Sequence, residues 1–241
     1  MKRLIKNIVL ILTLLLIFAC FGPEPEPKPE PECKKYVDEF YPISAGNTWM
    51  FEKLWYDNGE IDSAWTDTHR YVIENTHITI FQDSLRTISE GYWHSEFQGV
   101  AAELKFNGPD GIYYTGLTYR DSIWFYTPQL YYKYPADVGE TWPIRLASVG
   151  YYFLDTLDMS CAAKEYIYIT PYDTFLTTVY HHGSSMGEDV SGYWHLFEYY
   201  CYGVGLIGYD VYSTEHAIYD FTQRNIQDLF ITYKLIDYCL Y

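Results

Sequence analysis

The stretch that decides the fold runs from Tyr41-Pro42-x-x-x-Gly46-x-Thr48-Trp49 through Met50-Phe51-Glu52-Lys53-Leu54-Trp55-Tyr56 to Asp57-Asn58-Gly59-Glu60. The proline fixes φ near about −65° and lacks an N–H donor, while the glycine permits a positive φ. The tryptophan supplies a large apolar side chain for a core. The residues after it are typical of a β-strand, and Asn-Gly is a strong signal for a tight hairpin. The stretch therefore predicts the entry into a strand and the turn that reverses it.

The opening phrase occurs a second time, as Tyr134-Pro135-x-x-x-Gly139-x-Thr141-Trp142. Two shorter matches follow in the same order: Gly91-Tyr92-Trp93-His94 recurs as Gly192-Tyr193-Trp194-His195, and Tyr132-Lys133 recurs as Tyr233-Lys234. Short aromatic matches also arise by chance in a chain with 28 Tyr, so a recurrent turn is the alternative. We predict two similar β units, residues 41–133 and 134–241. Their superposition should place Trp49 on Trp142 and Trp93 on Trp194.

Strand-like segments fill the rest of the chain, and no window of ten or more residues keeps a helical apolar period. The expected strands cover residues 61–71, 77–82, 85–90, 92–97, 100–106, 112–117, 121–132, 151–157, 163–170, 174–182, 193–200, 203–213 and 229–238. Aromatic residues make up 20% of the chain, which suits pleated, half-buried strands. The predicted fold is all-β: a curved antiparallel sheet, barrel or half-barrel that forms a single domain over residues 37–241.

The first 19 residues have the form of an export signal. Three basic residues precede an apolar stretch, Ile8 to Ala19, that is well short of the roughly 20 residues a membrane-spanning helix needs. Ile17-Phe18-Ala19-Cys20 resembles the lipobox of bacterial lipoproteins, although Phe18 is bulkier than the usual residue there. The resemblance implies a signal peptide over 1–19 and fatty-acyl (palmitate-type) lipid attachment at Cys20. The alternative is an ordinary cleaved signal that leaves a free secreted protein.

Residues 20–36 are expected to form a stalk between the lipid and the domain. The Pro/Glu alternation over residues 23–32 cannot form a core and favours an extended polyproline II conformation, which at about 3.1 Å per residue reaches about 30 Å. Phe21 stands where enteric lipoproteins retained in the inner membrane carry Asp, so the resemblance implies the outer membrane. Acidic residues soon after the lipidated Cys accompany surface export in some Gram-negative lineages. Periplasmic and surface-facing orientations are both left open.

The charge of the mature chain limits its partners. Signal removal takes Lys2, Arg3 and Lys6 from the 16 basic residues and none of the 32 acidic ones, which leaves a net charge of −19. A chain with this charge repels phosphate backbones and anionic membrane surfaces. We therefore expect no nucleic-acid partner, and we expect contact with the membrane through the lipid anchor.

Four cysteines are left after lipidation: Cys33, Cys161, Cys201 and Cys239. An even number outside the cytoplasm permits two disulfides with three connectivities. A bond between Cys33 and Cys239 would join the two ends of the domain and leave Cys161 to pair with Cys201. The alternative is four free thiols.

No catalytic or metal-binding constellation is expected. Adjacent His181 and His182 point to opposite faces of a strand, and neither they nor Glu188-Asp189 match a zinc or calcium spacing. Ser184 and Ser185 lie in a polar loop that lacks a nucleophile elbow. His94 and His195 each follow Tyr-Trp in a repeated phrase and could approach each other if the units are related by a pseudo-twofold axis. The remaining histidines are His69, His77 and His216.

A family resemblance rests on Gly46-Asn47-Thr48-Trp49, Gly139-Glu140-Thr141-Trp142, Pro171-Tyr172-Asp173-Thr174-Phe175 and Tyr202-Gly203-Val204-Gly205-Leu206-Ile207-Gly208-Tyr209. This combination resembles a diffuse group of uncharacterised bacterial lipoproteins, over most of residues 41–238. The chain departs from the group's pattern at Asp173, where Gly is usual, and at Cys201-Tyr202, where a small residue or Pro is common. The group has no established activity, so the resemblance implies fold and location only.

These features predict a lipid-anchored lipoprotein of the cell envelope whose β domain binds or scaffolds a partner and is not an enzyme. We expect no cofactor and no metal. Two alternatives are a carrier of an apolar ligand in a β cavity and a surface glycan-binding module. The bound partner is a protein, a lipid or a glycan.

Overall fold

A computed structural model describes residues 33–42, 46–62, 67–76, 88–94, 101–119, 122–147, 154–185 and 192–240. These residues form one antiparallel sheet and two short 3-10 helices. The strands are β1 (Thr48–Asp57), β2 (Glu60–Ile61), β3 (Asp67–Thr76), β4 (Ile88–His94), β5 (Ala101–Gly108), β6 (Gly111–Tyr119), β7 (Ser122–Lys133), β8 (Thr141–Ala147), β9 (Leu154–Ile169), β10 (Thr174–Ser185), β11 (Tyr193–Cys201), β12 (Gly205–Thr214) and β13 (Leu229–Cys239). The helices are η2 (Phe221–Gln223) and η3 (Ile226–Asp228). The all-β prediction is confirmed.

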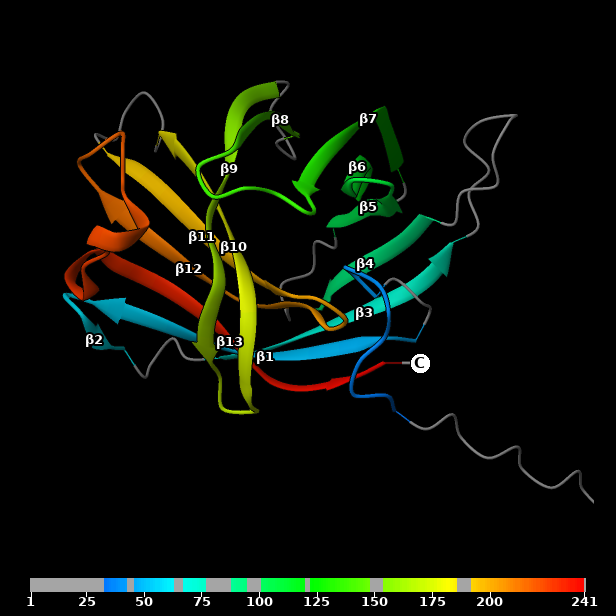
Figure 1. Ribbon diagram of the computed structural model, residues 1–241, viewed down its shortest axis with the longest axis horizontal. Coiled ribbons are helices and arrows are strands. Elements are labelled where there is room, and N and C mark those ends of the chain that lie inside the picture. The colour runs from blue at the N-terminus through cyan, green and yellow to red at the C-terminus, as the bar shows by residue number, and fades with distance from the viewer. Residues whose placement is uncertain are drawn as a thin grey trace, which may run out of the picture. The chain divides into compact units, whose positions relative to one another are not determined.

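The sheet consists of two meanders joined by the first and last strands. Its order is β7-β6-β5-β4-β3-β1-β13-β12-β11-β10-β9-β8, with β2 paired to β1 alone. β1 lies against β13 from Thr48 opposite Cys239 to Trp55 opposite Ile231 (Figure 1). Strands β7 and β8 follow each other in the chain but form the two edges. The curved antiparallel sheet is confirmed, and it is not closed into a barrel.

The opening stretch forms the strand and hairpin that its sequence predicts. Trp49, Phe51 and Leu54 of β1 are buried. Asn58 and Gly59 have φ values of 49° and 82°, which is the left-handed conformation that the Asn-Gly pair adopts most readily. The return segment differs from the expected strand over residues 61–71, because β2 ends at Ile61 and β3 begins at Asp67.

Proline marks both edges of the sheet. Pro143 lies exposed in β8, and Pro128 lies where the register of β7 against β6 shifts. Because proline cannot donate to a ladder, it is found on edge strands and at bulges. The expected interruption at Pro128 is therefore a bulge inside one strand. Residues 151–157 and 163–170 were likewise expected as two strands but belong to the single strand β9, from Leu154 onward.

Two groups of buried side chains form the core. The first packs around Phe51, Phe197, Tyr199 and Leu235 and involves mainly β1 and β9 to β13. The second, which we call the seam cluster, joins β6 and β7 to β8 through β11; its buried members are Phe40, Ile112, Tyr114, Tyr131, Tyr132, Ala136, Trp142, Ile144, Met159, Cys161, Tyr180 and Tyr200. The seam cluster fills the region where the two edge strands approach each other.

The repeated phrases take partly equivalent positions. Trp49 and Trp142 each stand in the first strand of a meander, and each indole donates to a backbone carbonyl, of Val204 at 2.8 Å and of Tyr131 at 3.0 Å. The shorter phrase does not correspond in this way, because Trp93 lies in β4, the third long strand of its meander, and Trp194 in β11, the fourth. A duplication of the whole unit stays a prediction.

Candidate functional site

The first described residues are fastened to the end of the sheet. We call residues 33–42 the strap. Cys33 is bonded to Cys239, the backbone N–H of Lys34 donates to the carbonyl of Leu240 at 2.7 Å, and that of Val37 donates to Gly203 at 3.0 Å. Gly203 in turn donates to the carbonyl of Glu39 at 2.9 Å. The strap therefore behaves as part of the sheet.

Aromatic side chains of the strap pack against the seam cluster. The buried ring of Phe40 stacks on Tyr134 at 4.2 Å between centroids, and Tyr41 lies parallel to Trp49 at 5.8 Å. The side-chain amide of Asn107, in β5, donates to the carbonyl of Tyr41 at 2.8 Å. These contacts connect the strap to both meanders.

The disulfide expectation holds for one pair only. The structure contains the bond between Cys33 and Cys239, whereas Cys161 and Cys201 are buried free thiols, so their predicted pairing is wrong. They lie on β9 and β11, which flank β10; two strand spacings are about 9.5 Å, beyond the reach of a disulfide. Burial raises the pKa of Cys201 to about 11 and raises that of Cys161. Neither thiol has the character of a reactive nucleophile. Cys20 lies outside the described residues.

His181 and His195, from neighbouring strands, are in contact on one face of the sheet. His181 Nε2 lies 3.1 Å from His195 Nδ1, and His195 Nε2 lies 2.8 Å from the carbonyl oxygen of His216. Since a carbonyl only accepts, neutral His195 must donate from Nε2 and accept at Nδ1, which makes His181 Nε2 the donor. Burial, then the neighbouring His195, lowers the pKa of His181 to about 3. His181 is therefore neutral at ordinary pH.

His182 points away from that pair, as the alternation along the strand predicted. Its side chain is buried, and neither ring nitrogen has a hydrogen-bond partner. Burial, and secondarily His195, lowers its pKa to about 4. In β4, residue His94 lies opposite Arg70 in the backbone register, and its side chain is outside the description. The hypothesis that His94 approaches His195 is therefore not tested.

A segment after β12, residues 215–228, covers the histidine pair and holds a buried ion pair. Arg224 Nη1 donates to the Tyr199 hydroxyl at 2.5 Å and lies 3.8 Å from Asp210 Oδ2. The guanidinium also packs over the ring of Phe221 at 3.7 Å. Burial raises the pKa of Asp210, against the hydrogen bonds from Thr232 and Tyr199 that lower it. The polar groups here are engaged with one another.

Part-buried rings form a row across three strands. Phe230 of β13 contacts Trp194 of β11 at 4.9 Å and Trp55 of β1 at 5.0 Å. The ammonium of Lys53 lies over Trp55 at 4.4 Å and over Tyr233 at 5.6 Å. Burial lowers the pKa of Lys53, which Asp67 opposes. We call Trp55, Trp194, Phe230 and Lys53 the ring row; the sequence showed its aromatic residues but not that they would meet.

The β9–β10 hairpin carries a second surface. The side chains of Ile167, Ile169 and Leu176 are 62%, 67% and 59% exposed. Tyr172, in the connecting turn, is also exposed and contacts Tyr238 at 5.0 Å. We call these four residues the apolar tip. The sequence alone did not reveal it, because the same alternation of apolar residues is expected of any strand.

Among the described residues, the other candidates do not form a catalytic or metal-binding site. Ser184 and Ser185 are the last two residues of β10 rather than part of the expected loop. Glu188, Asp189 and His77 lie outside the described residues. Within the described ranges no group of three or more His, Cys, Asp or Glu could hold a metal ion. Across the same residues no helix is long and apolar enough to cross a membrane.

No protein-family model and no curated sequence matches the chain. Two crystal structures are similar over 84% of this chain and 99% of their own. One is described as an exported protein with a YmcC-like fold from Bacteroides fragilis, with a TM-score of 0.43 and 11% identity. The other is described as a lipoprotein from Parabacteroides distasonis, with a TM-score of 0.38 and 13% identity.

Proposed function

We propose that the protein is a lipid-anchored lipoprotein of the cell envelope whose β domain binds or scaffolds a partner without catalysing a reaction. The observation that carries the proposal is the strap. Cys33 directly follows the Pro/Glu segment that comes after the lipobox. It is bonded to the last strand through Cys239. A disulfide of this kind persists in an oxidising compartment outside the cytoplasm. The proposed tether would thus join the domain at a residue that is covalently bound to its last strand.

The absence of a catalytic role is supported by how the buried polar groups are used. Arg224, Asp210 and Tyr199 bond to one another beneath the segment 215–228. His195 is held between His181 and the carbonyl of His216, with one ring nitrogen on each. Groups engaged in this way stabilise the fold, whereas a general base must be within reach of a substrate proton.

The ring row favours glycan binding over the transport of an apolar ligand. The C–H faces of a sugar pack on aromatic rings, and Lys53 beside Trp55 can donate to its hydroxyls. In the described part of the seam cluster, by contrast, Tyr132, Tyr180 and Tyr200 fill the interior with rings 4.5 to 5.7 Å apart. A packed interior leaves no room for a lipid at that end of the sheet.

Membrane fractionation tests the anchor. We expect the wild-type protein in the membrane fraction and Cys20→Ser in the soluble fraction, because the thiol is the site of acylation. Cys33→Ser keeps the lipobox and is the matched control, which should stay with the membrane. A Cys20→Ser protein that remains membrane-bound would contradict the anchor.

A glycan array with the purified protein tests the ring row. Trp194→Ala should abolish any binding that the wild type shows, while Tyr36→Ala removes an exposed ring outside the row and should not. Silence of the folded wild type on the array, or equal loss in both variants, would rule out the row as a glycan site.

A further inference from the structure

The apolar tip breaks the rule that the solvent face of an antiparallel sheet is polar. Leu176 lies directly opposite Ile167, and Ile169 follows two residues on, so the three side chains share one face. On the other face of the hairpin, Phe175 and Tyr168 are buried in the core. The hairpin is thus apolar on both faces, and no described residue covers the outer one.

A bulge sets this tip apart from the rest of the hairpin. The register between β9 and β10 shifts between Thr177 and Val179, opposite Lys164 and Glu165. Glu165 has a φ of 53°, in the left-handed region that residues other than glycine rarely adopt. Such bulges bend a strand and redirect its side chains. The bulge therefore orients the tip differently from the rest of the hairpin.

The tip is fastened beside the point where the tether enters the domain. Asp173, in the hairpin turn, accepts from Lys35 Nζ at 3.1 Å, and the hydroxyl of Tyr238 donates to the carbonyl of Lys35 at 2.8 Å. Lys35 is two residues from Cys33. Twelve residues, 21–32, separate Cys20 from Cys33, which at about 3.1 Å per residue is a reach of about 40 Å. A bilayer that holds a lipid on Cys20 would therefore lie within about 40 Å of Cys33.

We propose that the apolar tip inserts into the interface of the bilayer to which Cys20 is anchored, and so fixes how the domain stands on the membrane. The proposal rests on the lipid anchor of the proposed function. Tethering raises the local concentration of the bilayer surface to the order of millimolar, so a weak insertion becomes sufficient. Tyr172 supplies the aromatic ring typical of residues at the headgroup level.

The charges argue for a zwitterionic lipid surface and against a second copy of the chain. The ion pair of Lys35 with Asp173 leaves the turn of the tip locally neutral. Two mature chains, each with a net charge of −19, repel each other, and an anionic bilayer repels the domain in the same way. A phosphatidylcholine or phosphatidylethanolamine surface has no net charge and does not repel the domain electrostatically.

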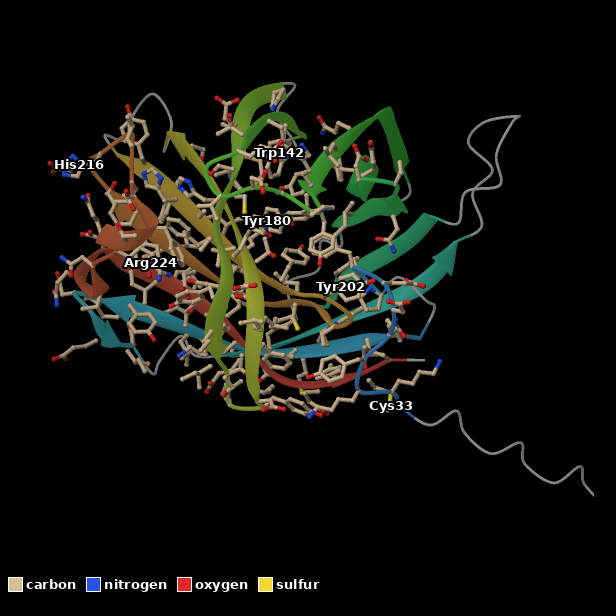
Figure 2. The ribbon with its side chains drawn as sticks, viewed as in Figure 1. Cys33, Trp142, Tyr180, Tyr202, His216 and Arg224 are labelled. Atoms are coloured by element: carbon tan, nitrogen blue, oxygen red, sulfur yellow. A yellow bond between two sulfur atoms is a disulfide. The ribbon has the colours of Figure 1, made fainter. Side chains whose placement is uncertain are left out.

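Quenching by brominated lipids tests the insertion in the full lipidated protein, reconstituted into phosphatidylcholine vesicles. Ile167→Trp and Leu176→Trp each place a reporter on the tip, and the signal is the fluorescence gained over the wild type. The matched control is Ile218→Trp. Ile218 is 90% exposed and lies two residues from His216, which Figure 2 shows at the opposite end of the view from Cys33.

We expect brominated lipid to remove most of the added fluorescence of the two tip reporters and none of that of Ile218→Trp. Equal quenching at both ends, or none at the tip while the protein stays with the vesicles, overturns the insertion but leaves the anchor intact. Failure of the wild type to stay with the vesicles overturns the anchor itself. If Ile167→Asp instead changes the size of the detergent-free protein in solution, a second copy covers the tip and the proposal is wrong.

Discussion

At the scale of single residues, two glycines with the same backbone conformation differ in the space available for a side chain. Gly139 and Gly203 have nearly the same φ, 83° and 81°. A Cβ on Gly139 would meet no heavy atom within 4 Å, whereas one on Gly203 would lie 2.6 Å from the carbonyl oxygen of Val37. The first position requires only a left-handed backbone, while the second also requires room for the strap.

Substitution by alanine separates these two requirements. Gly139→Ala should lower the free energy of unfolding by about 1 kcal/mol, which is the cost of the left-handed conformation. Gly203→Ala should cost about 2 to 3 kcal/mol, because the clash also displaces the strap. Urea unfolding followed by circular dichroism measures both. Equal costs would contradict the close packing of the strap on Gly203.

The buried histidines predict a loss of stability in acid. The pKa values of His181 and His182 fall from 6.5 in the unfolded chain to about 3 and about 4 in the fold. The folded state therefore binds fewer protons below pH 6.5. Stability is fully present above that pH and declines as the pH falls toward 4, by about 1.4 kcal/mol per pH unit for each group.

Removal of one of these histidines tests the assignment. In His182→Gln the slope of unfolding free energy against pH between about 6 and 4 should fall by about one proton, relative to the wild type. Urea unfolding at a series of pH values gives the slope. An unchanged slope would show that His182 is not buried in its neutral form.

The sequence could predict that His181 and His182 face opposite ways, because that follows from the geometry of a strand. It could not predict that His181 meets His195, since the contact depends on the register that pairs Gly183 with His195 across β10 and β11. Likewise, Arg224 follows β12 in a segment without a strand pattern. Its partner Asp210 is fixed only when the segment 215–228 lies on the sheet.

At the scale of elements, the edge strands β7 and β8 are joined by side chains rather than by a ladder. The indole of Trp142 in β8 donates to the carbonyl of Tyr131 in β7, and the hydroxyl of Tyr180 in β10 donates to the carbonyl of Lys133 at 2.7 Å. Lys133 and Glu140 form an ion pair across the turn between the two strands. These contacts hold the two edges together near the turn that connects them.

Tyr180→Phe removes one such contact and keeps the ring. We expect a loss of about 1 to 2 kcal/mol and faster hydrogen exchange in β7 and β8, because a buried carbonyl loses its donor. Tyr168→Phe is the matched control: its hydroxyl donates to the carbonyl of Tyr233 at 3.3 Å, away from the seam. Exchange that rises equally in both variants would contradict a local role for Tyr180.

Arg224 is expected to stabilise the segment 215–228 on the sheet through its ion pair with Asp210. Arg224→Met should lower the free energy of unfolding by about 3 to 5 kcal/mol, because it leaves the Asp210 carboxylate buried without its cation. Asp210→Asn in the same chain should recover part of that loss. Purely additive effects in this double-mutant cycle would show that the two groups do not interact.

At the scale of the whole molecule, the disulfide joins positions 206 residues apart. Closing so long a loop restricts the unfolded chain, and the expected stabilisation is about 5 kcal/mol at most. Cys33→Ser/Cys239→Ser should therefore unfold at a much lower urea concentration than the oxidised wild type. Reductant should bring the wild type to the level of the variant, and a wild type that is insensitive to reductant would contradict the bond.

The sequence predicted the all-β fold class and the curved antiparallel sheet well, because alternation, turn residues and the scarcity of helical periods are local signals. The hairpin at Asn58-Gly59 is the clearest example. The pairing of β1 with β13 and the open edge between β7 and β8 could not be predicted. Strand order depends on contacts between residues such as Phe51 and Leu235, which no local pattern reveals.

The pairing of β1 with β13 has a consequence for how the molecule is made. Synthesis delivers β1 early and β13 last, so the N-terminal meander must wait with its β1 edge unpaired until nearly the whole chain has emerged. An unpaired edge is a template for aggregation, and long-range pairing of this kind slows folding. The step that completes the sheet, and then locks it through Cys239, thus follows the synthesis of β13.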